Sequence, residues 1–359
     1  MGWMHVTLRA GRGVRTGWAS ALATFGVVLP GLGRGLAVFS GRFGVGFFVG
    51  LLEGLPDFGE ELAQHEMGNR HTMRLRGALQ LATHGRARWP NRPSWLRFAA
   101  VAIFQLKHLT LRTRDLTRGT AFYTEILGLQ ARPIDANHTE LSAAPDSPAL
   151  IVLRGAPSAP PRPRGTAGLF HVAILLRDRA HLAAAMARLT QTRWPIQGLS
   201  DHGVSEAIYL ADPDGNGVEL YRDRPAVRWP RAGDRLAMNT QRLDVAGVLA
   251  AMPSPPPASP MEGAVLGHVH LEVTDLDRSR TFYERELGLA VRQDDYPGAV
   301  FLAAEGYHHH IAVNTWARAR RPASPDAVGL VEIAAASASV RAPQQLADPD
   351  GIRLALAPL

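Results

Sequence analysis

Two stretches of this 359-residue chain have closely related sequences: HLTLRTRDLTRGTAFYTEILGLQAR at 108–132 and HVHLEVTDLDRSRTFYERELGLAVR at 268–292. Eleven of the 25 aligned residues are identical. In each stretch, apolar and polar residues first alternate as in a strand and then recur with helical spacing. Each helical part ends at Leu-Gly, and we expect Gly128 and Gly288 to cap the helices. The repeat predicts a fold assembled from copies of one strand–helix unit.

A second repeat involves two further parts of the chain. GLFHVAILL at 168–176 corresponds to GLVEIAAA at 329–336, and the turn at 212–215, Asp-Pro-Asp-Gly, recurs at 348–351. The offset between the copies falls from 161 residues at the strand to 136 at the turn. The last copy therefore lacks about as many residues as one helix and one strand occupy.

We predict an α+β fold of four βαβββ modules, in which pairs of modules form cupped sheets. Their approximate bounds are 105–155 (module 1), 166–225 (module 2), 264–316 (module 3) and a truncated 327–359 (module 4). Proline-rich linkers separate them at 156–164, 253–260 and 318–325. In sequence order, the predicted domains are an N-terminal extension (1–104), modules 1 and 2 (105–226), a linker (227–263), and modules 3 and 4 (264–359).

Charge and composition restrict the possible functions. The chain has no cysteine, which excludes disulfides, thiolate metal sites and cysteine nucleophiles. The net charge of +7 lies entirely within residues 1–105, so the modules have no electrostatic reason to bind nucleic acid. The apolar run in this extension is interrupted by Arg34 and Arg42, and it is too short to predict a membrane span. We expect the extension to be poorly ordered, or to reflect a start codon set too early.

Histidines and carboxylates recur at matched positions of the modules. On the first strands these are His108, His171, His268 and Glu332; on the last strands they are Ala149, Glu219, His310 and Ala355. Because side chains alternate along a strand, matched residues point to the same face of their sheets. The matched positions therefore predict a metal site in a cup.

The pairing of the modules decides which residues meet. Modules 2 and 3 would gather His171, Glu219 and His268, with His310 as an additional ligand. Modules 1 and 2 would use His108 in place of His268. Either pairing provides two histidines and one carboxylate, the facial triad that leaves positions open on Fe(II). We favour the first pairing because it gathers the most candidate ligands.

Two residues precede Glu219 with a defined spacing, namely His202 and Tyr209. A histidine near a bound diol can accept or return a proton, since its ordinary pKa is near 6.5. A tyrosine hydroxyl can hold a bound oxygen by a hydrogen bond. Tyr209 could equally be an ordinary strand aromatic.

The motifs DHGVSEAIYLADPDGNGVELYRDRP (201–225), GHVHLEVTDL (267–276) and GYHHHIAVNTW (306–316) resemble the vicinal oxygen chelate superfamily. Residues 105–359 are similar to its two-domain, catechol-2,3-dioxygenase-like branch. The resemblance implies Glu219 as a metal ligand, His202 and Tyr209 as catalytic neighbours, and His268 rather than His108 as a ligand. It also implies that Ala355 leaves the C-terminal pair without a carboxylate.

We therefore expect a ring-cleaving extradiol dioxygenase that uses Fe(II), with Mn, Zn or Ni as alternative metals. Its substrates would be a small aromatic diol and O2. A glyoxalase-type lyase or isomerase is one alternative, and a metal-free protein that binds a small molecule is another. We expect a cytoplasmic protein without nucleic-acid or membrane partners, and both a monomer and a homo-oligomer fit the sequence.

Overall fold

The structure is a computed structural model and describes residues 7–9, 22–27, 37–42, 103–233 and 235–359. Residues 1–88 and 89–359 form two compact units. In the first unit, three strands form an antiparallel sheet in the order β1 (Thr7–Arg9), β2 (Leu22–Val27) and β3 (Ala37–Arg42). Most of the N-terminal extension lies outside the described residues. The prediction that it is poorly ordered therefore concerns residues outside the described part of the chain.

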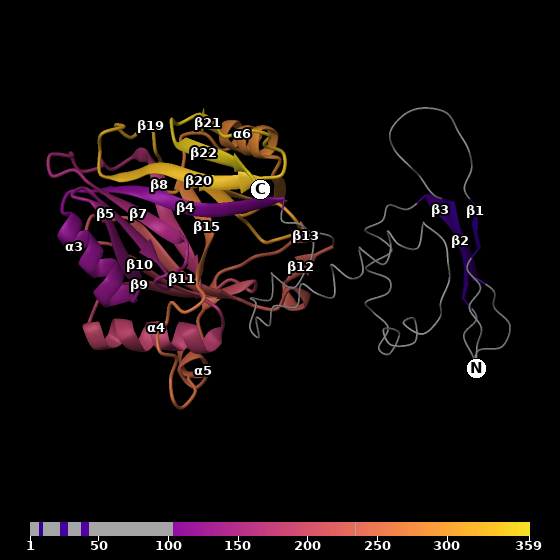
Figure 1. Cartoon of the computed structure of the whole chain (residues 1–359), viewed down its shortest axis with the longest axis horizontal. Helices are drawn as coiled ribbons and strands as arrows, with labels where there is room; N and C mark the ends of the chain where they lie inside the picture. Colours follow the sequence, from indigo (N-terminus) through magenta and orange to yellow (C-terminus); the bar gives the residue numbers. More distant parts are fainter. Residues whose placement is uncertain (1–6, 10–21, 28–36, 43–102, 234) are drawn as a thin grey trace. The chain divides into compact units, whose positions relative to one another are not determined.

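The larger sheet of the second unit has ten strands and combines modules 2 and 3 (Figure 1). At its centre β8 and β15 run antiparallel, and each pairs in parallel with the last strand of its own module. In spatial order the strands are β14 (Gln241–Arg242), β9 (Ile196–Asp201), β10 (Ser205–Ala211), β11 (Gly217–Asp223), β8 (Thr166–Leu175), β15 (Val265–Glu272), β18 (Ile311–Asn314), β17 (Ala299–Ala303) and β16 (Ala290–Gln293), with β19 (Arg321–Pro322) pairing with β8.

The second sheet has seven strands and combines modules 4 and 1. Strands β4 and β20, from opposite ends of the second unit, lie side by side at its centre (Figure 1). In spatial order the strands are β21 (Gln344–Ala347), β22 (Arg353–Pro358), β20 (Gly329–Ser337), β4 (Phe104–Thr113), β7 (Ala149–Gly155), β6 (His138–Ser142) and β5 (Gln130–Asp135).

Each sheet thus takes one module from either half of the chain, and the sheets cut across the sequence-order division at 227–263. The pairing of modules 2 and 3 is the one that we favoured from the sequence. Whether 105–226 and 264–359 fold as separate domains stays a prediction. Module 4 contains three strands, and residues 329–359, all of which are described, include no helix.

The helices follow the first strands of modules 1 to 3. They are α3 (Leu116–Ala121), which continues as the π-helix η3 (Phe122–Leu127), α4 (Arg179–Thr192) and α6 (Leu276–Leu287); the short α5 (Val245–Leu249) and the 3₁₀ turn η4 (Ala226–Arg228) lie between modules 2 and 3. Each of the three module helices begins after an aspartate whose side chain accepts a backbone N–H, the usual N-cap interaction. Gly128 and Gly288 cap their helices as expected, and both adopt the left-handed conformation. The predicted α+β class is confirmed.

Consecutive modules are joined through buried tyrosines. The Tyr123 hydroxyl donates to Asp212 in the turn of module 2, and the Tyr283 hydroxyl donates to Asp348 in the matching turn of module 4. Apolar residues of both sheets and of the helices form one large core. The sheets therefore pair modules 2 with 3 and 4 with 1, while the tyrosines connect 1 with 2 and 3 with 4.

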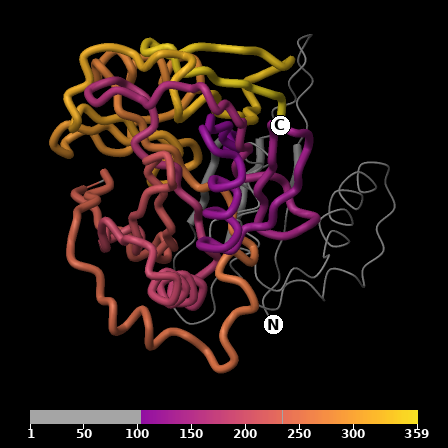
Figure 2. Tube along the Cα trace, turned by 90° about the vertical axis from the view of Figure 1, so that its left-hand side faces the viewer, coloured from indigo at the N-terminus to yellow at the C-terminus, as the bar shows by residue number. Residues whose placement is uncertain are grey.

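The segment between modules 2 and 3 contains the small hairpin of β12 (Arg231–Ala232) and β13 (Arg235–Leu236). Figure 2 shows it as a long, mostly irregular loop between η4 and β15. In the described part of the chain, no helix is long and apolar enough to cross a membrane.

Candidate metal centre and its cavity

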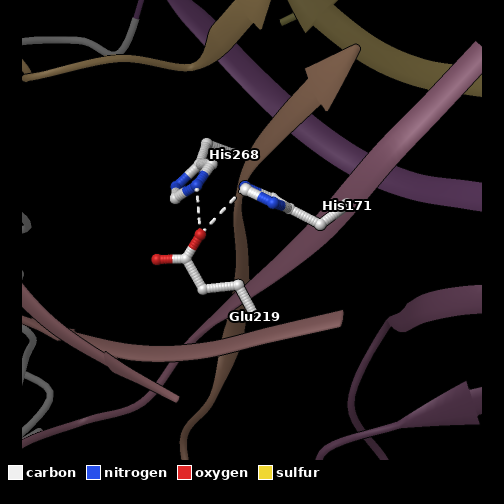
Figure 3. A group of neighbouring side chains, drawn as sticks. All are labelled: His171, Glu219 and His268. Carbon is white, nitrogen blue, oxygen red and sulfur yellow. Dashed lines mark hydrogen bonds and ion pairs between the residues drawn. The ribbon is translucent and has the colours of Figure 1, made fainter. Parts of the chain in front are cut away.

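Three of the predicted ligands meet in the larger sheet. His171 on β8, Glu219 on β11 and His268 on β15 place one ligand atom each within 4.8 Å of the others (Figure 3). Glu219 Oε2 lies 2.9 Å from His171 Nε2 and 3.1 Å from His268 Nε2. All three residues are buried, with at most 5% of their surface exposed.

The strand register explains this convergence. Ala173 on β8 lies opposite Glu219 on one side and opposite His268 on the other. His171 is two residues from Ala173 and therefore points to the same face. A register shift at Gly267 allows β15 to keep His268 in this position. The small side chain of Ala173 thus leaves open the space that the three larger side chains surround.

Glycine is required at Gly217 and Gly267 by close approaches of the chain. A Cβ atom at Gly217 would lie 2.1 Å from the Phe170 carbonyl oxygen, and one at Gly267 would lie 1.8 Å from the Tyr221 hydroxyl oxygen. Real Cβ contacts are never this short, so larger residues would push β11 from β8 or displace Tyr221. Both glycines therefore fix strands that carry the triad.

The donor set fits a divalent transition metal. His171 Nε2 lies close to the carboxylate, but it is buried and its geometry does not satisfy a hydrogen bond. His268 Nδ1 also has no hydrogen-bond partner. Buried polar atoms are rarely left unpaired, and a cation held between two imidazoles and a carboxylate would use the free nitrogen lone pair of His171.

The electrostatics favour a charged Glu219 beside a neutral His268. Burial raises the pKa of Glu219, but His268 and His171 outweigh it, and the pKa lies well below its usual value. Burial lowers the pKa of His268 to about 4, against the opposing effect of Glu219. Ionised carboxylate and neutral imidazole are the forms in which these side chains bind metals.

His310 is not brought to the triad. His171 and His268 both stand seven residues before a helix N-cap, so they occupy equivalent positions in modules 2 and 3. Two residues further along each strand, Ala173 is therefore equivalent to His270. His270 lies opposite Ala312 on β18, so Ala312 occupies the position that Glu219 has in module 2. His310 lies just before that strand, where its Nδ1 accepts a hydrogen bond from the Ala304 N–H at 3.2 Å.

His108 lies in the other sheet, on β4 opposite Ala334. It is half-buried, and burial lowers its pKa, with partial compensation by Glu332 and Glu140. By the same register argument, Val152 rather than Ala149 corresponds to Glu219 in module 1. The matched position in module 4 is Ala355, as predicted. In the larger sheet Glu219 completes the triad. In the smaller sheet the corresponding positions, beside His108 and Glu332, hold Val152 and Ala355 and provide no carboxylate.

His202 and Tyr209 form a hydrogen-bonded pair at the edge of the triad. His202 Nδ1 lies 2.9 Å from the Asn239 carbonyl oxygen, which can only accept, so this nitrogen carries the proton. The neutral ring then accepts at Nε2 from the Tyr209 hydroxyl, 2.7 Å away. Tyr209 lies opposite Glu219 in the β10–β11 pair. Burial and the charge of Glu219 raise the Tyr209 pKa well above its usual value, which keeps the hydroxyl protonated.

A cavity of about 410 Å³ opens onto the triad. Its lining includes His202 and Tyr209, and it is rich in aromatic and apolar side chains. Lining residues that the sequence analysis did not single out include Phe170, Val204, Met238, Thr240, Tyr296, Phe301 and Trp316. Met238 and Thr240 belong to 227–263, which was predicted to be only a linker.

Two more histidines, His270 and His309, line the cavity. His309 packs against His268 with ring centres 4.0 Å apart and ring planes tilted by 50°. His308 Nε2 lies 2.9 Å from an Asp223 carboxylate oxygen, and His308 Nδ1 lies 2.7 Å from His309 Nδ1. When His308 is neutral, its Nε2–H donates to the carboxylate and its Nδ1 accepts from His309 Nδ1–H, which leaves His309 Nε2 unprotonated. Burial keeps the pKa of His309 well below the usual value.

These two histidines could have been suspected from their neighbours in sequence. His270 stands two residues from His268 on a strand, and His309 lies in the run 308–310, from which only His310 was selected. The positions of Tyr296, Met238 and Thr240 had no comparable signal, because they lie outside the repeated motifs.

Known proteins resemble this chain in sequence and in fold. Residues 105–220 match the sequence profile of the glyoxalase/bleomycin resistance protein/dioxygenase superfamily. The chain is 40% identical to a catechol-2,3-dioxygenase of Bacillus subtilis over 219 residues, which cover 60% of this chain and 76% of that protein. It is 32% identical to biphenyl-2,3-diol 1,2-dioxygenase 3 of Rhodococcus globerulus over 33% of this chain and 63% of that protein. The crystal structure of a putative dioxygenase from Bacillus subtilis aligns with a TM-score of 0.50 at 14% identity, covering 71% of this chain and 84% of that one.

Proposed function

Because the chain belongs to the glyoxalase/bleomycin resistance protein/dioxygenase superfamily, we propose that it is a non-haem Fe(II) extradiol dioxygenase. It would cleave the ring of a small aromatic diol at a bond beside the two hydroxyl-bearing carbons, and both atoms of O2 would enter the product. The observation that carries the proposal is the convergence of His171, Glu219 and His268 beside the His202–Tyr209 pair in one aromatic cavity. The names of the two relatives support the same class of reaction.

The triad would hold the metal. Two imidazole nitrogens and one carboxylate oxygen leave coordination positions free, and ferrous iron bound there supplies chelation of the diol and a site for O2. Glu219 also neutralises one of the two positive charges of such an ion. The burial of all three side chains excludes water, which strengthens the electrostatic interactions of the site.

His202 and Tyr209 would move a proton. The Tyr209 hydroxyl lies between Glu219 and His202, because its strand neighbour is Glu219 and its hydrogen-bond acceptor is His202 Nε2. A diol proton that passes to the Tyr209 oxygen can therefore continue to His202. The Asn239 carbonyl keeps the His202 ring oriented with Nε2 toward the hydroxyl. This arrangement satisfies the geometric requirement for a general base.

His309 is a second base in the cavity. Its unprotonated Nε2 is set by the hydrogen bonds through His308 to Asp223. His309 and His202 come from different modules and both line the cavity. We propose that the two imidazoles divide the proton transfers that the two hydroxyl groups of the substrate require.

A glyoxalase-type lyase or isomerase has less support. That reaction calls for a second carboxylate where module 3 matches Glu219, and Ala312 stands at this position. A metal-free binding protein has less support as well. A buried carboxylate beside two buried histidines costs free energy, and a cavity that only binds a small molecule does not need such a group.

The proposal is tested by anaerobic loading with Fe(II), metal analysis and O2 uptake with catechol. We expect one iron per chain and catechol-dependent O2 consumption by the loaded protein. The matched control is His108→Ala, which removes the corresponding histidine of the other sheet and should retain both properties. A protein that binds no iron, or that binds iron and consumes no O2 with any diol, would overturn the proposal.

A further inference from the structure

One wall of the cavity is aromatic. Phe170 and Trp316 pack edge to face with ring centres 5.3 Å apart. His270 lies 5.1 Å from both of these rings, and Phe301 lies 5.9 Å from His270. Tyr296 completes the wall, with its ring centre 5.7 Å from that of Phe301. The wall therefore extends continuously from the buried triad to the outside.

The outer end of this wall is apolar and exposed. Phe170 retains 39% of its surface exposed and Trp316 retains 42%. Large exposed aromatic residues that line a cavity mark a surface that a ligand covers. Trp316 is held in place, because its indole N–H donates to the Pro297 carbonyl at 2.8 Å and its ring lies against Gly298.

The described residues offer no permanent cation to an anionic substituent in the cavity. Among them, the lining contains no lysine or arginine, and its one carboxylate is Glu219, which is engaged with the two histidines. With Fe(II), Glu219 and a singly deprotonated diol, the charges at the centre already sum to zero. A carboxylate elsewhere in the cavity would therefore be buried without a counter-ion, which is costly.

We propose that the substrate is an uncharged diol with a planar apolar substituent, which lies against Phe170 and Trp316, and that diols bearing a carboxylate are rejected. This inference rests on the proposed function, because the triad fixes where the diol oxygens lie. A cavity of about 410 Å³ is within the range that bound small molecules of several rings fill, so a single ring would leave the outer wall uncovered.

The test measures anaerobic binding to the iron-loaded protein by calorimetry, so it does not depend on turnover. The probes are 4-methylcatechol and 3,4-dihydroxybenzoate, which differ only in a methyl or carboxylate group, together with catechol and biphenyl-2,3-diol. We expect the carboxylate to weaken binding by about 100-fold or more, and the second ring to strengthen binding by about 10-fold relative to catechol. Equal affinities within either pair would overturn the inference.

Variants assign the effect to the wall. Trp316→Arg places a cation in the wall. It should reduce the ratio of the affinity for 4-methylcatechol to the affinity for 3,4-dihydroxybenzoate by about 10-fold. Leu249→Arg is the matched control, because Leu249 is 43% exposed and does not line the cavity, and it should keep the wild-type ratio. Phe170→Arg is a second variant in case Trp316→Arg fails to fold. An unchanged ratio in a folded wall variant, or an equal change in Leu249→Arg, would overturn the assignment.

Failure of this inference can be told apart from failure of the proposed function. If the protein consumes O2 with 3,4-dihydroxybenzoate as well as it does with 4-methylcatechol, the inference is wrong and the dioxygenase activity stands. If the expected binding ratios are found and no diol supports O2 uptake, the dioxygenase proposal is wrong and the preference of the cavity stands.

Discussion

Acidification of the metal-free protein should lower its free energy of unfolding, because His268 is buried as a neutral imidazole. Its pKa is lowered from 6.5 to about 4 in the folded chain, mainly because burial penalises the imidazolium. Between these two values the unfolded chain binds more protons than the folded chain. Stability therefore falls as the pH falls from above 6.5 toward 4. Glu219, His270 and His309 have lowered pKa values and act in the same direction.

The His268 contribution can be isolated by substitution. Over the interval from about pH 7.5 to about pH 4.5, a shift of this size corresponds to a loss of about 2 to 3 kcal/mol in the free energy of unfolding. His268→Asn keeps a polar side chain that cannot titrate, so its loss over the interval should be smaller than the wild-type loss by about this amount.

The assay is urea unfolding of the metal-free protein at the two pH values, followed by circular dichroism. Val269→Ala is the matched control, because it removes buried apolar volume from the same strand without changing a titratable group. It should lower stability by a similar amount at both pH values. Equal acid losses in the wild type and His268→Asn would refute the argument that His268 is neutral because it is buried.

Three further predictions concern function. Glu219→Ala and His171→Ala should each lower metal affinity by about 10-fold or far more, measured as iron per chain after gel filtration, and full iron retention by either would contradict the ligand assignment. His202→Ala should keep iron and lower kcat by about 10²- to 10⁴-fold, so unchanged turnover would remove His202 from the mechanism. Deletion of residues 1–95 should leave an active protein because all four modules lie after this point, and aggregation of the shortened chain would show that the deleted part is needed.

The sequence was informative where the repeats are strong. Gly128 and Gly288 follow their helices as expected, and His171 and His268, which were matched from the sequence, both stand seven residues before a helix N-cap. These features follow from local periodicity and capping, which a single chain displays without its partners.

Strand register was the part that the sequence did not predict. His310 was matched with Glu219, but the hydrogen-bonded register places Ala312 there. Register depends on how many residues the preceding turn takes up, and a shift of two residues keeps the face of the sheet but moves the matched position along the strand. The cavity wall was missed for a related reason. Tyr296 and Thr240, whose hydroxyl oxygens lie 2.8 Å apart, come from segments far apart in sequence, and only the folded chain brings them together.

The central claim is tested most directly by turnover of an uncharged diol under ¹⁸O2 with the iron-loaded protein, followed by mass spectrometry of the product. The account predicts a ring-opened product that carries both labelled oxygen atoms, formed by the wild type and by His108→Ala and absent with His268→Ala. A product with the aromatic ring intact, a product without both labels, or equal product from His268→Ala would contradict it.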